Sequence, residues 1–164
     1  MNLDRFPLGA PRVELPPGKP KYPFTLAADF VYLWPGYGKW KPLDIAVPKG
    51  YRTDLLSIPR PLWPLLSPFG EGVWGAFPHD LLYGTQFSLP GQSKGDARAM
   101  ADQILFDAAR DSGAPRWRST LIWSGVRAGG MFAWNDCNPQ EASDDLQAMV
   151  EATERWNIRK FLSE

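Results

Sequence analysis

The one histidine of the chain, His79, is followed directly by Asp80 and one helical turn later by Tyr83. Histidine changes its charge near neutral pH, so it commonly serves as a general base or a metal ligand. Residues four apart share one face of a helix, so the side chains of His79 and Tyr83 point the same way. The side chain of Asp80 points about 100° round the helix axis from that of His79. A helix at this position can have one of two roles. It presents a base and a metal-binding carboxylate to the same cleft, or it carries a structural histidine into the core.

Asp102 is one candidate for the carboxylate that orients the ring of His79. It lies on a helix that we predict from Ser93 to about residue 111, because Ser93 begins a capping box. A carboxylate from an antiparallel helix is the group that fixes one tautomer of an imidazole. The alternative is that Asp102 only pairs with Arg98, one turn earlier on the same helix.

Asp54 is the second candidate for this orienting carboxylate. Hydroxyl groups and arginines surround it between residues 51 and 60. Asp54 either points into the cleft, where it orients His79 or binds a metal, or forms a structural ion pair with an arginine. In the structural case a buried polar network locks the helices to the strands. Its further members are Thr53, Ser57, Arg60, Tyr83 and Arg98.

The first third of the chain predicts an extended arm followed by a hairpin. Prolines at positions 7, 11, 16, 17, 20 and 23 exclude a helix and a central strand, so residues 1–23 form a proline-rich arm lying on the domain or on a partner. Apolar periodicity predicts strands over residues 24–34 and 43–47. The Gly36-Tyr37-Gly38 stretch between them is a hairpin turn or, alternatively, a calcium loop of carbonyl oxygens.

Three to four helices follow the hairpin. Pro78 is tolerated only in a first turn, so His79 is predicted near a helix N-terminus, where the helix dipole favours a neutral ring. A helix over residues 117–134 carries a stripe of small residues that lets another helix approach, namely Gly125, Ala128, Gly129 and Ala133. Asn138 caps a last helix over residues 139–162, whose apolar positions suit docking on the domain or on a partner.

These elements predict an α+β fold. A small antiparallel hairpin or sheet, at about residues 24–52, packs on the helices in a single domain of residues 24–164. The chain length of 164 residues is ordinary for one domain with a sizeable core.

Composition excludes several classes of function. Lys+Arg and Asp+Glu each number 18, so no net charge attracts nucleic acid, and no nucleic-acid partner is expected. The single cysteine excludes an internal disulfide and a zinc site of the CxxC type. No apolar run approaches the roughly 20 residues of a membrane span. The first residues lack the basic start and apolar run of a signal peptide.

Four ordered motifs resemble an uncharacterised family found in tailed bacteriophages and prophages. The motifs are V-P-x-G-[FY]-x-T-D-x-x-S-I-P-R at residues 47–60, H-D-x-L-Y at 79–83, R-x-x-A-D-x-x-F around Asp102, and V-R-x-G-G at 126–130. The resemblance covers about residues 24–135. It implies a protein of phage origin, present in the virion or in the bacterial host cytoplasm before assembly or lysis.

The H-D-x-x-Y motif is also similar to that of secreted and viral phospholipases A2. The resemblance implies that His79 activates water, that Asp80 binds calcium and that Asp102 orients the histidine. A divalent metal, calcium or zinc, is therefore the cofactor that this site would take. This likeness concerns the site and not the fold.

Two functions follow as expectations. The first is a structural or accessory component of the virion, in the tail, baseplate or neck, which binds other phage proteins through the arm and the last helix. The alternative is a hydrolase of the host envelope, with His79, Asp102 and Asp54 as catalytic residues and Asp80 as the metal ligand. The two functions differ in whether His79 faces a solvent-filled pocket or sits satisfied in the core.

Overall fold

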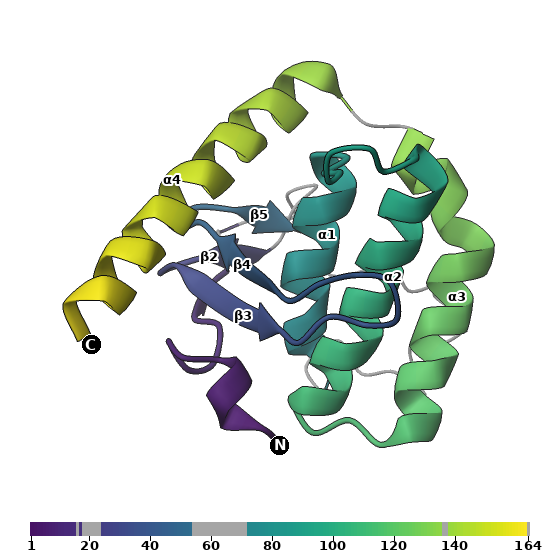
Figure 1. The fold of residues 1–164 in the computed structure, drawn as a ribbon, viewed down its shortest axis with the longest axis horizontal. Helices are drawn as coiled ribbons and strands as arrows, with labels where there is room; N and C mark the ends of the chain where they lie inside the picture. Colours follow the sequence, from purple (N-terminus) through teal and green to yellow (C-terminus); the bar gives the residue numbers. More distant parts are fainter. Residues whose placement is uncertain (16, 18–23, 54–71, 136–137, 164) are drawn as a thin grey trace.

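The computed structural model describes residues 1–15, 17, 24–53, 72–135 and 138–163. Within these residues two small antiparallel sheets combine with four α-helices, which confirms the predicted α+β class (Figure 1). None of the described helices has the length and apolar character needed to cross a membrane.

The two sheets are built from short strands. Strands β3 (Phe30–Trp34) and β4 (Leu43–Val47) form the predicted hairpin, with Phe30 opposite Val47 and Trp34 opposite Leu43. In the other sheet β2 (Phe24–Leu26) lies between β1 (Val13–Glu14) and β5 (Arg52–Thr53).

The prediction of one strand over residues 24–34 is wrong, because the chain bends between β2 and β3 and each part joins a different sheet. Asp29 lies at this bend. Its carboxylate accepts the backbone N–H of Lys49 at 2.8 Å and pairs with the guanidinium of Arg155 at 2.9 Å. These contacts give the charged side chain of Asp29 its partners. The apolar pattern of one continuous strand does not account for a charged side chain at this position.

The hairpin β3–β4 lies between two layers of helix (Figure 1). Alternate residues of a strand point to opposite faces. On one face Tyr32, Trp34 and Ile45 enter the main core with helices α1 (Ala76–Gly84) and α2 (Lys94–Asp111). On the other face Val31 and Ala46 pack against helix α4 (Pro139–Ser163). Helix α3 (Arg116–Asn135) packs against α2, on the side away from α4.

Polar contacts fix the hairpin to both layers. The Trp34 Nε1 atom donates to Asp107 at 2.8 Å and the Tyr32 hydroxyl donates to Asp111 at 2.9 Å, which ties β3 to α2. The Trp156 Nε1 atom donates to Asp44 at 2.9 Å, which ties α4 to β4. Buried indole and phenol groups commonly find such partners, so these contacts set the orientation of each helix on the hairpin.

The helix boundaries follow the predicted caps. The Ser93 side chain accepts the backbone N–H of Asp96 at 3.1 Å, and α2 begins at the next residue. The Asn138 side chain accepts the backbone N–H of Gln140 at 3.1 Å, and α4 begins at Pro139. The side-chain oxygen at each N-cap satisfies a backbone donor that has no partner within the helix.

The described part of the N-terminal arm lies on the domain. Phe6 is only 2% exposed and stacks on Phe30 and Tyr32 at 5.8 and 5.2 Å between ring centroids. A short 3-10 turn, Leu3–Arg5, precedes it, and β1 then pairs with β2. The arm therefore adds an aromatic ring to the core through its first residues.

Candidate functional site

Helix α1 carries His79 and begins in close contact with α2. The 3-10 turn Val73–Gly75 leads into α1, and a Cβ atom added at Gly75 would lie 2.9 Å from the carbonyl oxygen of Leu105. Only glycine allows this approach of backbone to backbone. Pro78 occupies the first turn of α1, as predicted, because its missing N–H needs no partner there. His79 is thereby held at the start of α1, facing α2.

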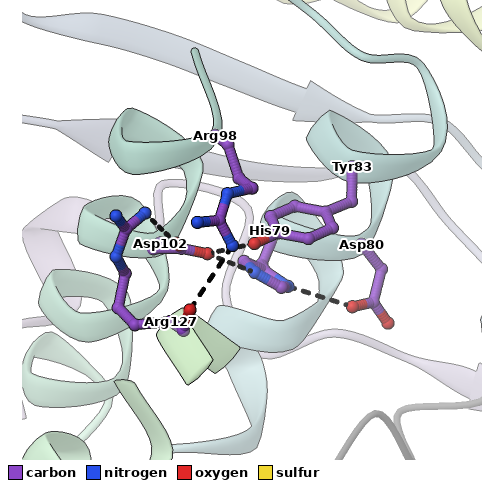
Figure 2. Close-up of polar contacts among 6 residues, drawn as sticks. All are labelled: His79, Asp80, Tyr83, Arg98, Asp102 and Arg127. Carbon is purple, nitrogen blue, oxygen red and sulfur yellow. Dashed lines mark hydrogen bonds and ion pairs between the residues drawn. The ribbon is translucent and has the colours of Figure 1, made fainter. Parts of the chain in front are cut away.

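Both ring nitrogens of His79 lie beside carboxylates. The Nε2 atom is 3.3 Å from Asp102 Oδ1 on α2, and the Nδ1 atom is 3.2 Å from Asp80 Oδ1 on α1 (Figure 2). His79 is 3% exposed. Its ring also packs on that of Tyr83, one turn later, with 4.2 Å between ring centroids. The ring is thus fixed in position by contacts on both edges and on one face.

Asp102 is the centre of the polar contacts and is fully buried. Its Oδ1 atom, which faces His79, also accepts the hydroxyl hydrogen of Tyr83. Its Oδ2 atom accepts a hydrogen bond from Arg127 Nη1 of α3 at 2.7 Å. The ion pair therefore forms with Arg127 and not with Arg98, whose Nη1 atom instead donates to the backbone carbonyl of Arg127 at 3.5 Å (Figure 2). One carboxylate joins three helices.

Asp80 extends the network to the sheet. The Thr53 hydroxyl of β5 donates to Asp80 Oδ2, while Asp80 Oδ1 faces His79. Thr53 is buried, whereas the side chain of Asp80 is 15% exposed. Asp80 is consequently the member of the histidine–carboxylate group that lies nearest to solvent.

The charge states follow from these contacts. Burial by itself raises the pKa of Asp102, but the hydrogen bonds from His79, Tyr83 and Arg127 outweigh it and hold the pKa of this carboxyl below its usual range. Burial by itself lowers the pKa of His79, but the carboxylates of Asp102 and Asp80 outweigh it, so the pKa of His79 is raised. Burial and Asp102 raise the pKa of Tyr83, which keeps its hydroxyl as a donor.

The pKa of His79 therefore shifts in the direction opposite to the one expected from the helix dipole. A helix dipole acts as about half a unit charge that is effective within one turn. Two full carboxylate charges within hydrogen-bonding distance of His79 exceed that effect. These contacts favour the protonated ring, in which both nitrogens are donors, and so raise the pKa of His79.

The described residues supply few ligands for a metal ion. They contain no group of three or more His, Cys, Asp or Glu side chains that could hold one. Calcium takes six to eight oxygen ligands. The Gly36-Tyr37-Gly38 stretch does not supply them beside Asp80, because it forms a tight turn that Lys39 links to Asp96 at 2.7 Å, at the start of α2. The residues described here do not fit a calcium or zinc centre around Asp80.

The structure brings together most of the residues predicted for the site. His79 contacts both Asp80 and Asp102, and Thr53, Tyr83 and Arg98 border this group. Asp54, Ser57 and Arg60 lie outside the described residues. Asp102, one of the two candidates for the orienting carboxylate, contacts Nε2 of His79.

Sequence reasoning missed two contributors from α3. Arg127 was noted only within the V-R-x-G-G motif, yet it is the ion-pair partner of Asp102. Trp134 packs edge-on against Tyr83, with 5.0 Å between centroids. Val126, Gly130 and Trp134 lie on the face of α3 that packs against the core. Their spacing of four residues is the sequence signal that predicts this face.

At Gly125, Ala128 and Gly129 the small-residue stripe on α3 does not have its predicted role. Ala128 and Gly129 are exposed, and nothing lies within 4 Å of a Cβ atom added at Gly125 or Gly129. The close approach occurs at Gly130, where such a Cβ atom would lie 2.6 Å from the Tyr83 hydroxyl. The inward face of α3 includes Gly130 rather than the stripe, because Arg127 and Trp134 turn it toward α1 and α2.

Gly130→Ala is expected to lower the free energy of unfolding by about 1–3 kcal/mol, the usual cost of inserting a methyl group into a packed site. The new Cβ atom displaces the Tyr83 hydroxyl from Asp102. Urea unfolding followed by tryptophan fluorescence measures the change. Gly125→Ala is the matched control on the same helix, and it should stabilise by up to about 1 kcal/mol through helix propensity alone. Equal effects at both positions would contradict the packing described at Tyr83.

Comparison with known proteins places this arrangement in a family. Comparisons with curated proteins and with solved structures give no match. Residues 24–126, more than half of the chain, match the family described as "Protein of unknown function (DUF1353)". The match includes α1 and α2, with His79, Asp80 and Asp102, and it ends one residue before Arg127. The chain therefore belongs to this family of proteins of unknown function.

Proposed function

We propose that the protein is a hydrolase of the histidine–aspartate type, of phage origin, that cleaves an ester bond in lipids of the host envelope. The observation that carries the proposal is the setting of Asp102. A buried, ionised carboxylate contacts Nε2 of His79 and accepts a hydrogen bond from Tyr83, one turn along the same helix. These are the roles that the resemblance to phospholipases A2 implies for His79 and Asp102.

Energetics supports a function for this cluster. A buried ion pair usually stabilises a fold no better than well-packed apolar side chains, because its charges lose their hydration. The cluster holds the imidazole ring of His79, the carboxylate of Asp102 and the guanidinium of Arg127 near one another. Titratable groups whose pKa values are shifted by burial together with a specific charged partner are concentrated at active sites.

The reacting nitrogen is Nδ1. Nε2 faces the fully buried Asp102, whereas Nδ1 faces Asp80, whose side chain is 15% exposed. After His79 loses the proton on Nδ1, this nitrogen takes a proton from water and the hydroxide attacks the carbonyl carbon of the ester. The bond to the alcohol oxygen then breaks, and the proton on Nδ1 passes to that oxygen. Asp102 keeps the other proton on Nε2 throughout and so preserves the tautomer.

The test is release of fatty acid from phosphatidylglycerol vesicles by the purified chain, measured from pH 5 to 10 with calcium, with zinc and with EDTA. We expect the rate to rise with pH above about 6.5, because the pKa of His79 is raised and the imidazolium is not a base. His79→Gln should reduce the rate by about 10²–10⁴-fold, the usual contribution of a general base. Asp80→Asn removes the carboxylate at Nδ1 and should move the pH profile to lower pH.

Asp96→Asn is the matched control for these substitutions. Asp96 is an exposed carboxylate at the start of α2 that pairs with Lys39. Its loss should leave the rate and the pH profile unchanged. The hydrolase proposal fails if the wild-type chain releases no fatty acid under any of these conditions, or if folded His79→Gln is as active as wild type.

A second candidate is a structural or accessory component of the virion, in the tail, baseplate or neck. The observation that favours it is the satisfaction of His79, which is 3% exposed and has a carboxylate at each nitrogen. A network of this kind can have a purely structural role, which is to hold α1, α2, α3 and β5 together. In that case His79→Gln destabilises the fold, wild type shows no esterase activity, and the chain is found in purified particles by mass spectrometry.

A further inference from the structure

Arg127 reaches the site of His79 from a third helix. His79 belongs to α1 and Asp102 to α2, whereas Arg127 lies on α3. The Nη1 atom of Arg127 donates to Asp102 Oδ2 at 2.7 Å, and the side chain of Arg127 is 33% exposed (Figure 2). Arg98 Nη1 of α2 donates to the backbone carbonyl of Arg127 at 3.5 Å, which ties α3 to α2 at this residue. Arg127 is therefore a partly exposed charge that is held against a fully buried carboxylate.

The two oxygens of the Asp102 carboxylate have separate partners. Oδ1 lies 3.3 Å from His79 Nε2 and accepts the hydroxyl hydrogen of Tyr83, while Oδ2 accepts a hydrogen bond from Arg127. The terminal torsion of an aspartate is broad and roughly two-fold, so a carboxylate by itself does not keep one oxygen on one side. A hydrogen bond between charged groups at Oδ2 is strong and opposes this rotation. Arg127 thus keeps Oδ1 directed at His79.

Arg127 also changes the charge that surrounds His79. The titratable or charged groups around the ring, among the residues that the structure describes, are Asp80 and Tyr83 of α1, Asp102 and Arg98 of α2, and Arg127 of α3 (Figure 2). The two carboxylates favour the protonated ring, which is not a base. The guanidinium of Arg127 has the opposite charge and pairs with one of these carboxylates, so it offsets part of their effect. His79 consequently loses its proton at a lower pH than it would beside an unpaired Asp102.

We propose that Arg127 is a positioning residue of the His79 site, which acts through Asp102 by fixing the orientation of its carboxylate and offsetting part of its charge. The inference rests on the proposed hydrolase for the reaction that this positioning serves. Arg127 and Asp80 have opposite effects: the carboxylate at Nδ1 raises the pH at which the base forms, and the guanidinium beyond Asp102 lowers it. Arginine suits this role because its guanidinium stays protonated across the pH range of the assay.

The lone histidine makes the test direct, because a single Cε1–H resonance in the NMR spectrum reports the protonation of His79. We expect Arg127→Gln to raise the pKa of His79 by about 0.5–1 unit, less than the 1–3 units typical of charges in direct contact. Arg127→Lys keeps the charge and should restore at least about half of this shift. Arg116→Gln is the matched control, because Arg116 is exposed and lies about 16 Å from Arg127 along the same helix. It should leave the pKa of His79 unchanged.

The same variants separate positioning from stability in the fatty-acid assay. In Arg127→Gln the rise of the rate should move to higher pH by the shift measured in the NMR titration, opposite in direction to that of Asp80→Asn. The rate reached above this rise should fall by about 10–100-fold, because Asp102 no longer holds the ring in one geometry. Arg127→Lys should recover part of both changes, and Arg116→Gln should match wild type. A merely structural role for Arg127 would lower the stability and leave the pKa of His79 and the pH profile where they are.

A measurement on wild type decides the question if Arg127→Gln does not fold. Coupled groups sense each other's titration, so the Cζ resonance of Arg127 should move with the same midpoint as the resonance of His79. The proposal is overturned if the pKa of His79 in folded Arg127→Gln is unchanged or lowered, or if the Cζ resonance of Arg127 in wild type does not follow that titration. A wild-type chain that releases no fatty acid refutes the hydrolase alone, because neither NMR titration depends on activity.

Discussion

Replacing Asp102 with alanine is expected to lower the free energy of unfolding by about 3–5 kcal/mol, the usual cost of removing one partner from a buried charge pair. The substitution leaves the ring of His79 without its carboxylate at Nε2 and the guanidinium of Arg127 without its ion pair. It also leaves the Tyr83 hydroxyl without its acceptor. Urea denaturation at pH 7, followed by circular dichroism and by fluorescence, measures the loss.

The matched comparison on the same helix is Asp96→Ala. Asp96 has the same side chain and also an ion pair, with Lys39, but this pair lies at the surface and is screened by water. We expect the free energy of unfolding of Asp96→Ala to stay close to that of wild type. If Asp102→Ala were no more destabilising than Asp96→Ala, the polar network would not contribute to the stability of the helical layer.

Raising the pH above 6.5 is expected to reduce the stability of wild type more than that of His79→Gln. The pKa of His79 is raised in the folded protein relative to the unfolded chain. A raised pKa gives a stability contribution that is complete below the unfolded value of about 6.5 and is lost as the pH rises through the folded value. Between the two values, one proton changes the free energy of unfolding by up to about 1.4 kcal/mol for each pH unit.

Urea denaturation of wild type and His79→Gln in parallel from pH 5.5 to 9.5 isolates this contribution. Titrating groups that do not contact His79 contribute equally to both proteins, so their effects cancel in the difference. The difference in free energy of unfolding should be largest at pH 5.5–6.5 and should shrink as the pH rises. A difference that grows toward alkaline pH would mean that the folded protein prefers the neutral ring, with a pKa below 6.5.

The elements of this protein were largely predictable from local patterns in the sequence. Ser93 and Asn138 mark the starts of α2 and α4 because a side-chain oxygen at an N-cap is a local requirement. The spacing of His79 and Tyr83 predicted a shared face, and the two rings do pack on each other. The α+β class followed from alternating strands and then helices.

The break between β2 and β3 was not predictable in this way. The apolar pattern runs on through residues 27–29, but Asp29 meets Lys49 and Arg155, which are distant in sequence. The orientation of α3 was missed for the same reason. Small residues suggested one contact face, whereas Gly130 lies inward because of its fit to Tyr83 on α1.

The sequence by itself identified the candidate site residues, since a lone histidine beside a carboxylate and one turn from a tyrosine is visible in one dimension. Only the tertiary structure decided that Asp102 contacts Nε2, that Arg127 and not Arg98 pairs with Asp102, and that the pKa of His79 is raised. The physical reason is that pairing and charge depend on distances and burial between separate helices. Those quantities are set by how α1, α2 and α3 pack, which no local pattern specifies.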